Sequence, residues 1–294
     1  MLIPISWPPK VRIIRVDAVC CPVFTITLLF HPTAAPLDGR SVTAKGLHGL
    51  LFKALKAADP EETDWLHDHP APKPFSLAPL YAEGGVLAGL RLGTITPRAA
   101  QLFLRAWEWQ RARGFRLAIG RQSFVVAEVQ CAAGPGWADL VKARPVRVVE
   151  LEFLSPTTFR QGPGHLPLPV PYNVFSWPWR VWRSYAPPAV MPDDWLAWCR
   201  QDLFVTDVDI RTVPIYITPE DTLSGFVGRA RFETNKGTRE QLSLLHALAR
   251  LAAYTGVGRK TTMGMGAVEL VGTAPLVRPW SPADPSAFNR PTAA

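Results

Sequence analysis

Cysteine is scarce in this 294-residue sequence, and its spacing excludes two classes of site. The four cysteines, at positions 20, 21, 131 and 199, form no C-x-x-C pair and have no histidine pair near them. Neither a structural zinc site nor a disulfide framework has this spacing. We therefore expect buried thiols in a reducing compartment.

A long apolar run is also missing. The most apolar stretch, residues 18–30, is shorter than a membrane span, contains Pro22 and is β-branched like a strand. The first ten residues lack the basic start and apolar core of a signal peptide. The sequence therefore predicts a cytoplasmic protein with no membrane partner.

Acidic residues are outnumbered: 24 Asp and Glu stand against 32 Lys and Arg, which gives a net charge of +8. Such a balance favours association with a polyanion, although a solvated basic face is an alternative. Because 48% of the residues are hydrophobic, the chain has enough apolar surface for a globular core.

The spacing of the hydrophobic residues and the positions of Pro and Gly between them predict a β-α-β-β-α-β order in the first half. This is the order of a ferredoxin-like unit. Thr96-Pro97 is typical of a helix start, whereas we interpret Asp59-Pro60 as a helix stop. The expected elements are a strand at 11–30, a helix at 43–58, a hairpin of 75–81 and 86–95, a helix at 97–113 and extended chain at 115–130.

The second half repeats this order with longer insertions. Thr238 and Gln241 form a capping box, and Gly256 is expected as the αL glycine that ends the same helix. The expected elements are a strand at 146–154, a Pro- and Trp-rich excursion at 163–191, a helix at 193–203, strands at 208–217 and 224–233, a helix at 238–254 and a strand at 267–271. We predict an α+β protein with tandem ferredoxin-like (β-α-β-β-α-β) domains at 1–138 and 139–294.

The loop GVGRKTTMGMG, at 256–266, has the composition of a phosphate-binding segment. Glycines let backbone N–H groups approach a phosphate, and basic and hydroxyl side chains add charge and donors. A Walker A loop would need G-x-x-x-x-G-K-[ST] between a strand and a helix, but Arg259 separates Gly258 from Lys260 and the order is helix then strand. We therefore expect no nucleotide cofactor. A tight turn back to the sheet is the alternative.

Four segments in this order make the chain resemble the Cas6-type CRISPR precursor-RNA endoribonucleases of the repeat-associated mysterious protein superfamily. They are KPFSLAPL (73–80), LEFLSPTTFR (151–160), GFVGRARF (225–232) and the glycine-rich loop, which is the most specific. The resemblance spans nearly the whole chain.

The resemblance implies tandem ferredoxin-like folds, no cofactor, and one metal-independent cut in each CRISPR repeat of the precursor crRNA, leaving a 5′-hydroxyl and a 2′,3′-cyclic phosphate. CRISPR effector proteins are further candidate partners. Two alternatives stay open: a non-catalytic RNA-binding subunit of an effector complex, and an unrelated ferredoxin-like metabolic domain. The RNA-binding candidates in the loop are Gly258, Arg259, Lys260, Thr261, Thr262, Gly264 and Gly266.

Cleavage by the RNA's own 2′-hydroxyl needs proton transfer near neutral pH, which histidine supplies. His48 is the first catalytic candidate, because it lies in the expected helix at 43–58, where the resembled family often carries its catalytic histidine. Lys45, three residues earlier, is its basic neighbour. His67 is the second catalytic candidate; with Asp68 and His69 it forms an H-x-H-type loop that lacks further metal ligands.

Arginines mark further candidate RNA contacts. Arg229 and Arg231 fall on one face of the expected strand 224–233, where they would line a phosphate path. Trp107 and Trp109 cannot share one helix face, so at least one should pack in the core. The aromatic and arginine-rich residues 172–185 fit an RNA-facing platform, a partner contact or a loop that covers the second sheet.

Overall fold

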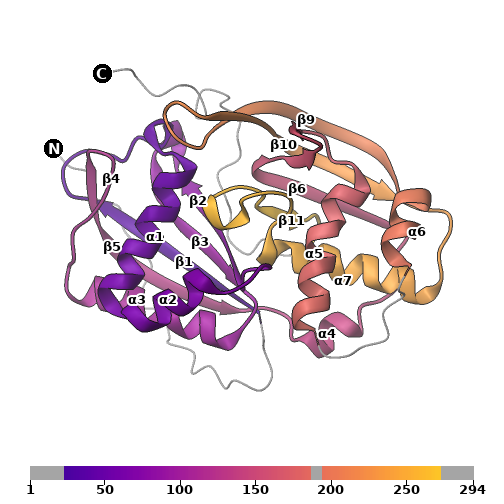
Figure 1. Cartoon of the computed structure of the whole chain (residues 1–294), viewed down its shortest axis with the longest axis horizontal. Helices are drawn as coiled ribbons and strands as arrows, with labels where there is room; N and C mark the ends of the chain where they lie inside the picture. Colours follow the sequence, from indigo (N-terminus) through magenta and orange to yellow (C-terminus); the bar gives the residue numbers. More distant parts are fainter. Residues whose placement is uncertain (1–22, 187–193, 273–294) are drawn as a thin grey trace.

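The computed structural model of the chain describes residues 23–186 and 194–272. These residues form two larger antiparallel sheets that lie side by side, each with helices packed on it (Figure 1). Part of the expected strand at 11–30 lies outside the described residues, as do Cys20 and Cys21. Its described part is a strand that begins at Phe24.

The first sheet has the strand order β2-β3-β1-β5-β4, so that β1 lies between β3 and β5. Its helices cover one face, because Ile26 and Leu28 of β1 are buried in one cluster with Leu51 and Phe103 from two of these helices. The elements are β1 (Phe24–Pro32), α1 (Ala44–Ala58), α2 (Pro60–Asp68), β2 (Phe75–Tyr81), β3 (Leu87–Thr94), α3 (Pro97–Ala112), β4 (Leu117–Ile119) and β5 (Gln122–Ala133). Trp107 is fully buried, as expected for one of the two tryptophans.

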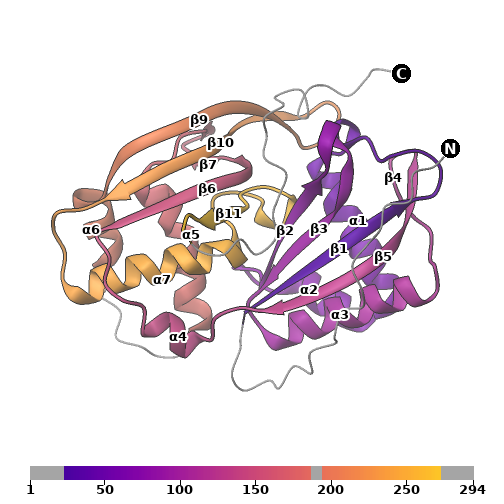
Figure 2. The ribbon, with the colours of Figure 1, turned by 180° about the vertical axis from the view of Figure 1, so that it is seen from behind.

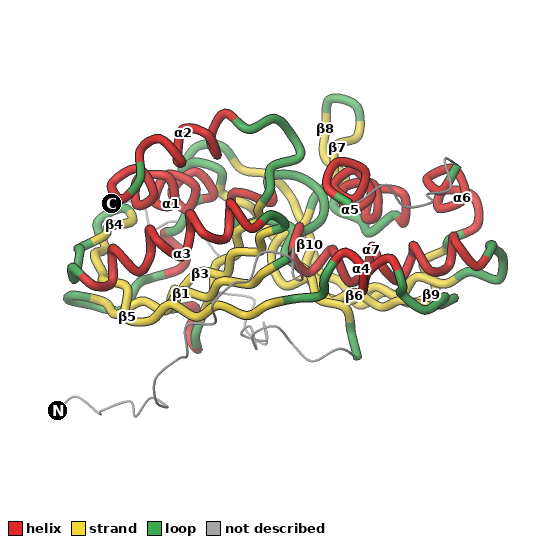
Figure 3. The backbone as a smooth tube through the Cα atoms, turned by 90° about the horizontal axis from the view of Figure 1, so that it is seen from below, coloured by secondary structure: helices red, strands yellow, loops and turns green. Residues whose placement is uncertain are grey.

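The second sheet has the order β11-β6-β10-β9, and here β6 lies between β10 and β11. Figure 3 shows the helices of both halves on one side of the two sheets. The elements are α4 (Trp137–Val141), β6 (Val148–Thr157), α5 (Pro171–Tyr185), α6 (Trp195–Asp202), β9 (Phe204–Tyr216), β10 (Thr222–Glu233), α7 (Arg239–Thr255) and β11 (Val268–Leu270). A small hairpin of β7 (Phe159–Gln161) and β8 (Gly164–Leu166) follows β6, and the short 3-10 helix η3 (Thr261–Met263) precedes β11.

In each half, the first strand of the unit lies between the third strand and the last strand, which is the ferredoxin-like arrangement. The expectation of an α+β protein with tandem ferredoxin-like folds is therefore confirmed. We keep the division into 1–138 and 139–294 as a proposal; Trp137 and Leu140 of α4 pack in the second core.

The helix starts follow the capping residues. Thr43 accepts a hydrogen bond from Gly46 N (3.0 Å) at the start of α1, and Thr238 and Gln241 form both bonds of the capping box on α7. Gly256 ends α7 with a φ of 65°, but its ψ of −176° lies outside the αL region that we expected.

Asp59-Pro60 does end the first helix, since α1 stops at Ala58 with Asp59 as its C-cap, but the same pair also starts a helix that we did not expect. Asp59 accepts a hydrogen bond from Glu62 N (3.2 Å) as the N-cap of α2, and Pro60 occupies the first helical turn. As a result, His67 lies in the last turn of a helix rather than in a loop.

The interpretation of residues 163–191 as an irregular excursion was wrong over Pro171–Tyr185, which is helix α5. Pro171 lies in its first turn, where its missing N–H costs nothing, and Pro178 lies inside it. Because of the two prolines, we did not recognise the helical spacing of the apolar residues. That spacing is visible in the buried residues Val174, Phe175, Pro178, Val181 and Trp182.

The two halves join through β2, β3 and the segment from α7 to β11 (Figure 2). Arg91 of β3 pairs with Glu269 of β11 at 2.5 Å, and both side chains are largely buried. Ser76 of β2 donates to the carbonyl of Tyr254 in α7 at 2.7 Å. None of the helices in the described ranges combines the length and hydropathy that crossing a membrane requires.

Candidate active site

His48 lies in the second turn of α1, where the helix meets the glycine-rich loop of the other half. Its Nδ1 is 3.0 Å from the carbonyl oxygen of Thr262, 214 positions away in the sequence. The ring is partly buried and packs against Phe52 one turn later, with 4.6 Å between ring centroids. The site is therefore composite, because one half supplies the imidazole and the other half supplies its hydrogen-bond partner.

This contact fixes the tautomer of His48. A carbonyl oxygen only accepts, so Nδ1 must carry the proton that is shared with Thr262. In the neutral ring, Nε2 then has the free lone pair, which is the form that a general base needs. The backbone carbonyl thus acts as the orienting group that catalytic histidines commonly have.

Close packing explains two of the loop glycines. Gly264 has a φ of 94°, and a Cβ there would lie 2.7 Å from Leu47 Cδ1 of α1. At Gly258, a Cβ would lie 2.6 Å from the carbonyl oxygen of Thr158. Side chains at these positions would push the loop away from α1 and from the end of β6. The glycines therefore let the loop approach the helix that carries His48.

Part of the loop backbone is occupied by structural hydrogen bonds. Arg259 N donates to Thr158 O (3.1 Å), and Gly266 N donates to Pro156 O (3.1 Å). Thr261 is buried. Neither of these two amides is therefore free to bind an RNA phosphate. The same short loop has to form the tight turn back to the sheet and to provide any phosphate contacts.

The side chains of the loop are more accessible than its fixed amides. Lys260 is half-buried and holds a φ of 55°, a left-handed conformation that is uncommon outside glycine. Strained backbone of this kind is found preferentially at functional sites. Thr262 is half-buried, and its carbonyl is the partner of His48.

Arg259 points toward the β7–β8 hairpin, a feature that sequence reasoning missed. Its Nη1 donates to Nδ1 of His165 at 2.9 Å, and His165 pairs in register with the exposed Arg160. Two arginines and a histidine thus gather beside the glycine-rich loop. Arg259 was a candidate from the glycine-rich loop and Arg160 ends the segment LEFLSPTTFR, whereas no sequence signal pointed to His165.

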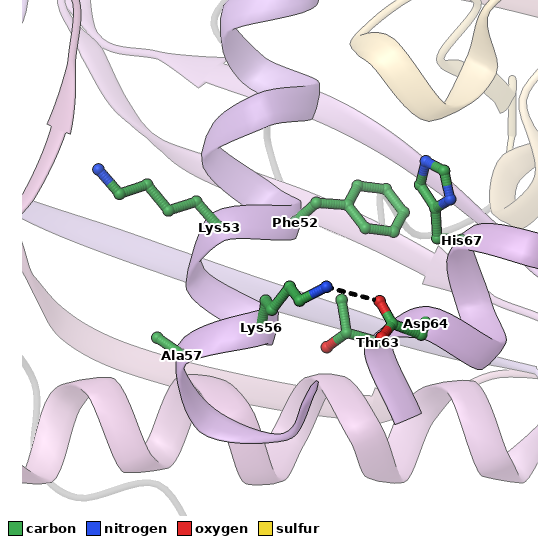
Figure 4. A pocket seen from close by; sticks show the side chains of 7 residues that line it. All are labelled: Phe52, Lys53, Lys56, Ala57, Thr63, Asp64 and His67. Carbon is green, nitrogen blue, oxygen red and sulfur yellow. Dashed lines mark hydrogen bonds and ion pairs between the residues drawn. The ribbon is translucent and has the colours of Figure 1, made fainter. Parts of the chain in front are cut away.

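Lys45 lies on α1, three residues before His48, and His67 lies on α2, beyond Phe52. Lys45 is exposed on the first turn of α1, and its backbone N donates to Ile217 O (3.1 Å). His67 faces the ring of Phe52 edge-on, with 5.4 Å between centroids (Figure 4). Phe52 therefore separates the two imidazoles, and the structure does not bring them into contact. His69 is directed elsewhere, since it stacks on Tyr185.

Arg229 and Arg231 do share one face of β10, but both have acidic partners. Arg229 pairs with Glu152 at 3.1 Å, and Arg231 approaches Glu233 at 3.5 Å. The alternate residues of β10, Ala230 among them, are buried under the helices. The two arginines therefore lie on the sheet face opposite to the helices, away from His48, and their RNA-binding role stays a prediction.

Comparisons with known proteins agree with this geometry. A family model described as CRISPR-associated endoribonuclease Cas6 matches residues 151–268, from β6 into β11. A curated CRISPR-associated endoribonuclease Cas6 of Mycobacterium tuberculosis (strain CDC 1551 / Oshkosh) is 27% identical over 246 residues, which are 82% of this chain and 76% of the relative.

Solved structures extend the likeness to both halves. A Cas6 product complex is 28% identical, with a TM-score of 0.73 over 85% of this chain and 100% of that chain. Thermus thermophilus Cas6 is 26% identical, with a TM-score of 0.68 over 86% of this chain and 100% of that chain. The family model, the curated relative and the solved structures thus make this chain similar to the Cas6 family of CRISPR-associated endoribonucleases, and they support an endoribonuclease role.

Proposed function

We propose that this chain binds CRISPR repeat RNA and cuts the precursor once within each repeat, without a metal ion, leaving a 5′-hydroxyl and a 2′,3′-cyclic phosphate. The observation that supports this best is the contact between His48 and the Thr262 carbonyl. In the neutral ring this contact leaves the lone pair of Nε2 free at the junction of the two halves, beside basic residues of both.

In this mechanism, Nε2 of His48 accepts the proton of the RNA 2′-hydroxyl. The 2′-oxygen then forms a bond to the adjacent phosphorus while the bond from phosphorus to the 5′-oxygen breaks, and the leaving oxygen takes up a proton. Lys45, one helical turn from His48, stabilises the negative charge on the phosphate oxygens. His67 is the second proton-transfer candidate, and its ring lies beyond Phe52.

The RNA strand in this proposal runs along the glycine-rich loop. Lys260 supplies charge there, with the hydroxyl groups of Thr261 and Thr262 nearby. Arg259 and the neighbouring Arg160 extend the basic surface onto the β7–β8 hairpin. This path adds a contact region that the sequence alone did not single out.

The test uses labelled repeat RNA from the same genome, incubated in EDTA with wild-type protein, His48→Ala and His67→Ala. We expect a single cut by the wild type and a loss of about 100- to 10,000-fold in cleavage rate for His48→Ala, the range for removing a general acid or base. RNA affinity should stay close to that of the wild type. His31→Ala, at an exposed position on β1, is the matched control.

Three outcomes would contradict parts of the proposal. A requirement for Mg²⁺ would exclude the metal-independent mechanism. Full activity of His48→Ala together with loss in His67→Ala would move the proton-transfer role to His67. Tight binding without any cut by the wild type would instead support an RNA-binding subunit of an effector complex.

A further inference from the structure

A cavity of about 540 Å³ opens between α1 and α2, next to the candidate active site. It falls within the volume range of small-molecule sites. Its lining residues are Phe52, Lys53, Lys56, Ala57, Thr63, Asp64 and His67. Figure 4 shows that Lys53 and Ala57 extend away from the others, so the cavity is formed mainly by Phe52, Lys56, Thr63, Asp64 and His67.

The cavity combines an apolar wall with a pair of polar groups. Phe52 and the stem of Lys56 form its α1 side, and Thr63 lies at its α2 side. Lys56 Nζ donates to Asp64 Oδ1 at 2.9 Å across the cavity, and both side chains are more than half exposed. The ammonium group of Lys56 is a hydrogen-bond donor and the adjacent carboxylate of Asp64 is an acceptor. The edge of a nucleobase likewise presents donors next to acceptors.

The cavity is also adjacent to the reacting group. The ring of Phe52 packs against His48 with 4.6 Å between centroids and against His67 with 5.4 Å. A ligand beside Phe52 would thus lie one aromatic ring away from the imidazole proposed to accept the proton of the 2′-hydroxyl. Single-stranded RNA is commonly read by splaying bases out onto aromatic side chains.

We propose that this cavity binds one splayed nucleotide of the repeat, directly flanking the scissile phosphate. Its base stacks on the Phe52 side and its edge meets Lys56 and Asp64. The proposal deepens the function proposed above and rests on it, since it assumes that repeat RNA reaches His48. Its consequence is that cleavage depends on the presence of a base at one flanking position.

The experiment fills the cavity from a position that does not touch His48. Lys56 points from α1 toward α2 (Figure 4), and Lys56→Trp would occupy the space in which the base would lie. Binding and cleavage are measured for repeat RNAs that each lack one base near the cut. We expect wild type to lose about tenfold in affinity when the bound base is removed, as for one stacked base. Lys56→Trp should show the same loss with intact RNA and no further loss with the abasic RNA.

Ala197→Trp, at an exposed position on α6, is the matched control and should behave like wild type. Asp64→Asn is a second variant, which removes the ion pair without filling the cavity and should change which base is preferred at the same position. Equal abasic sensitivity of Lys56→Trp and wild type at every position would overturn the cavity proposal while leaving cleavage intact. Failure of wild type to bind repeat RNA would overturn both proposals, and binding without cleavage would overturn only the catalytic one.

Discussion

The carbonyl of Thr262 decides which nitrogen of His48 can accept a proton, and Gly264 helps to decide where that carbonyl lies. Both residues belong to the loop that the sequence marks as a phosphate-binding segment. Phosphate binding and histidine orientation are compatible, because the first uses exposed side chains and the second uses a backbone carbonyl directed at α1. The loop therefore acts on catalysis through His48 as well as on binding.

Gly264→Ala tests this role of the loop. The substitution places a Cβ at a φ of 94° and 2.7 Å from Leu47 Cδ1. We expect it to lower the free energy of unfolding by about 1–3 kcal/mol, the cost of backbone strain. Cleavage should slow further than RNA affinity falls, because the His48 contact shifts. Urea unfolding and single-turnover cleavage measure the two effects.

The control for this substitution is Gly49→Ala on α1. Nothing lies within 4 Å of a Cβ at Gly49, so alanine should stabilise the helix by about 0.5–1 kcal/mol. Equal effects of the two substitutions on cleavage would mean that Gly264 does not set the position of the site.

At the level of elements, α1 carries the catalytic candidate near its start, where helices fray most easily. Thr43 accepts from Gly46 N (3.0 Å), and His48 lies only five residues beyond this cap. Thr43→Ala should therefore cost about 1 kcal/mol of stability. Cleavage should fall more steeply with temperature than in the wild type. Thr43→Ser, which keeps the hydroxyl, should restore both properties.

Elements were predictable from sequence where local chemistry decides them. The capping residues Thr96 and Thr238 marked two helix starts, and the strand order followed from the repeated unit. Local signals were incomplete at prolines. Pro60 follows the end of α1 as expected but also starts α2, and Pro178 is accommodated inside α5.

The candidate site was predictable only in part, because its residues lie far apart in the sequence. Resemblance to a family pointed to His48, but its partner Thr262 is 214 positions away, and no local pattern pairs them. The pair of Arg259 with His165 spans 94 positions and was missed for the same reason. The cavity between α1 and α2 required the helix that the Asp59-Pro60 interpretation left out.

For the whole molecule, the site exists only while the two halves hold one arrangement. Arg91 and Glu269 are 5% and 12% exposed at their junction, so removing either charge breaks a largely buried ion pair. Arg91→Met or Glu269→Met should each cost about 3–5 kcal/mol, and the double variant should recover much of that loss. The measured quantity is the coupling free energy between positions 91 and 269, obtained from the unfolding free energies of the two single variants and the double variant.

The cleavage rate, like the stability, should depend on the Arg91–Glu269 ion pair. Thr262 belongs to the same half as Glu269, and His48 belongs to the same half as Arg91. We expect Arg91→Met to lower the cleavage rate at temperatures where the protein is still folded, and the double variant to regain part of it. Arg98→Met removes an exposed pair with Glu62 (2.9 Å) and should cost about 1 kcal/mol or less without changing cleavage. If Arg91→Met reduced stability but left cleavage unchanged, the halves would hold His48 and Thr262 together without this ion pair, and the contacts of the loop with α1 would have to be sufficient by themselves.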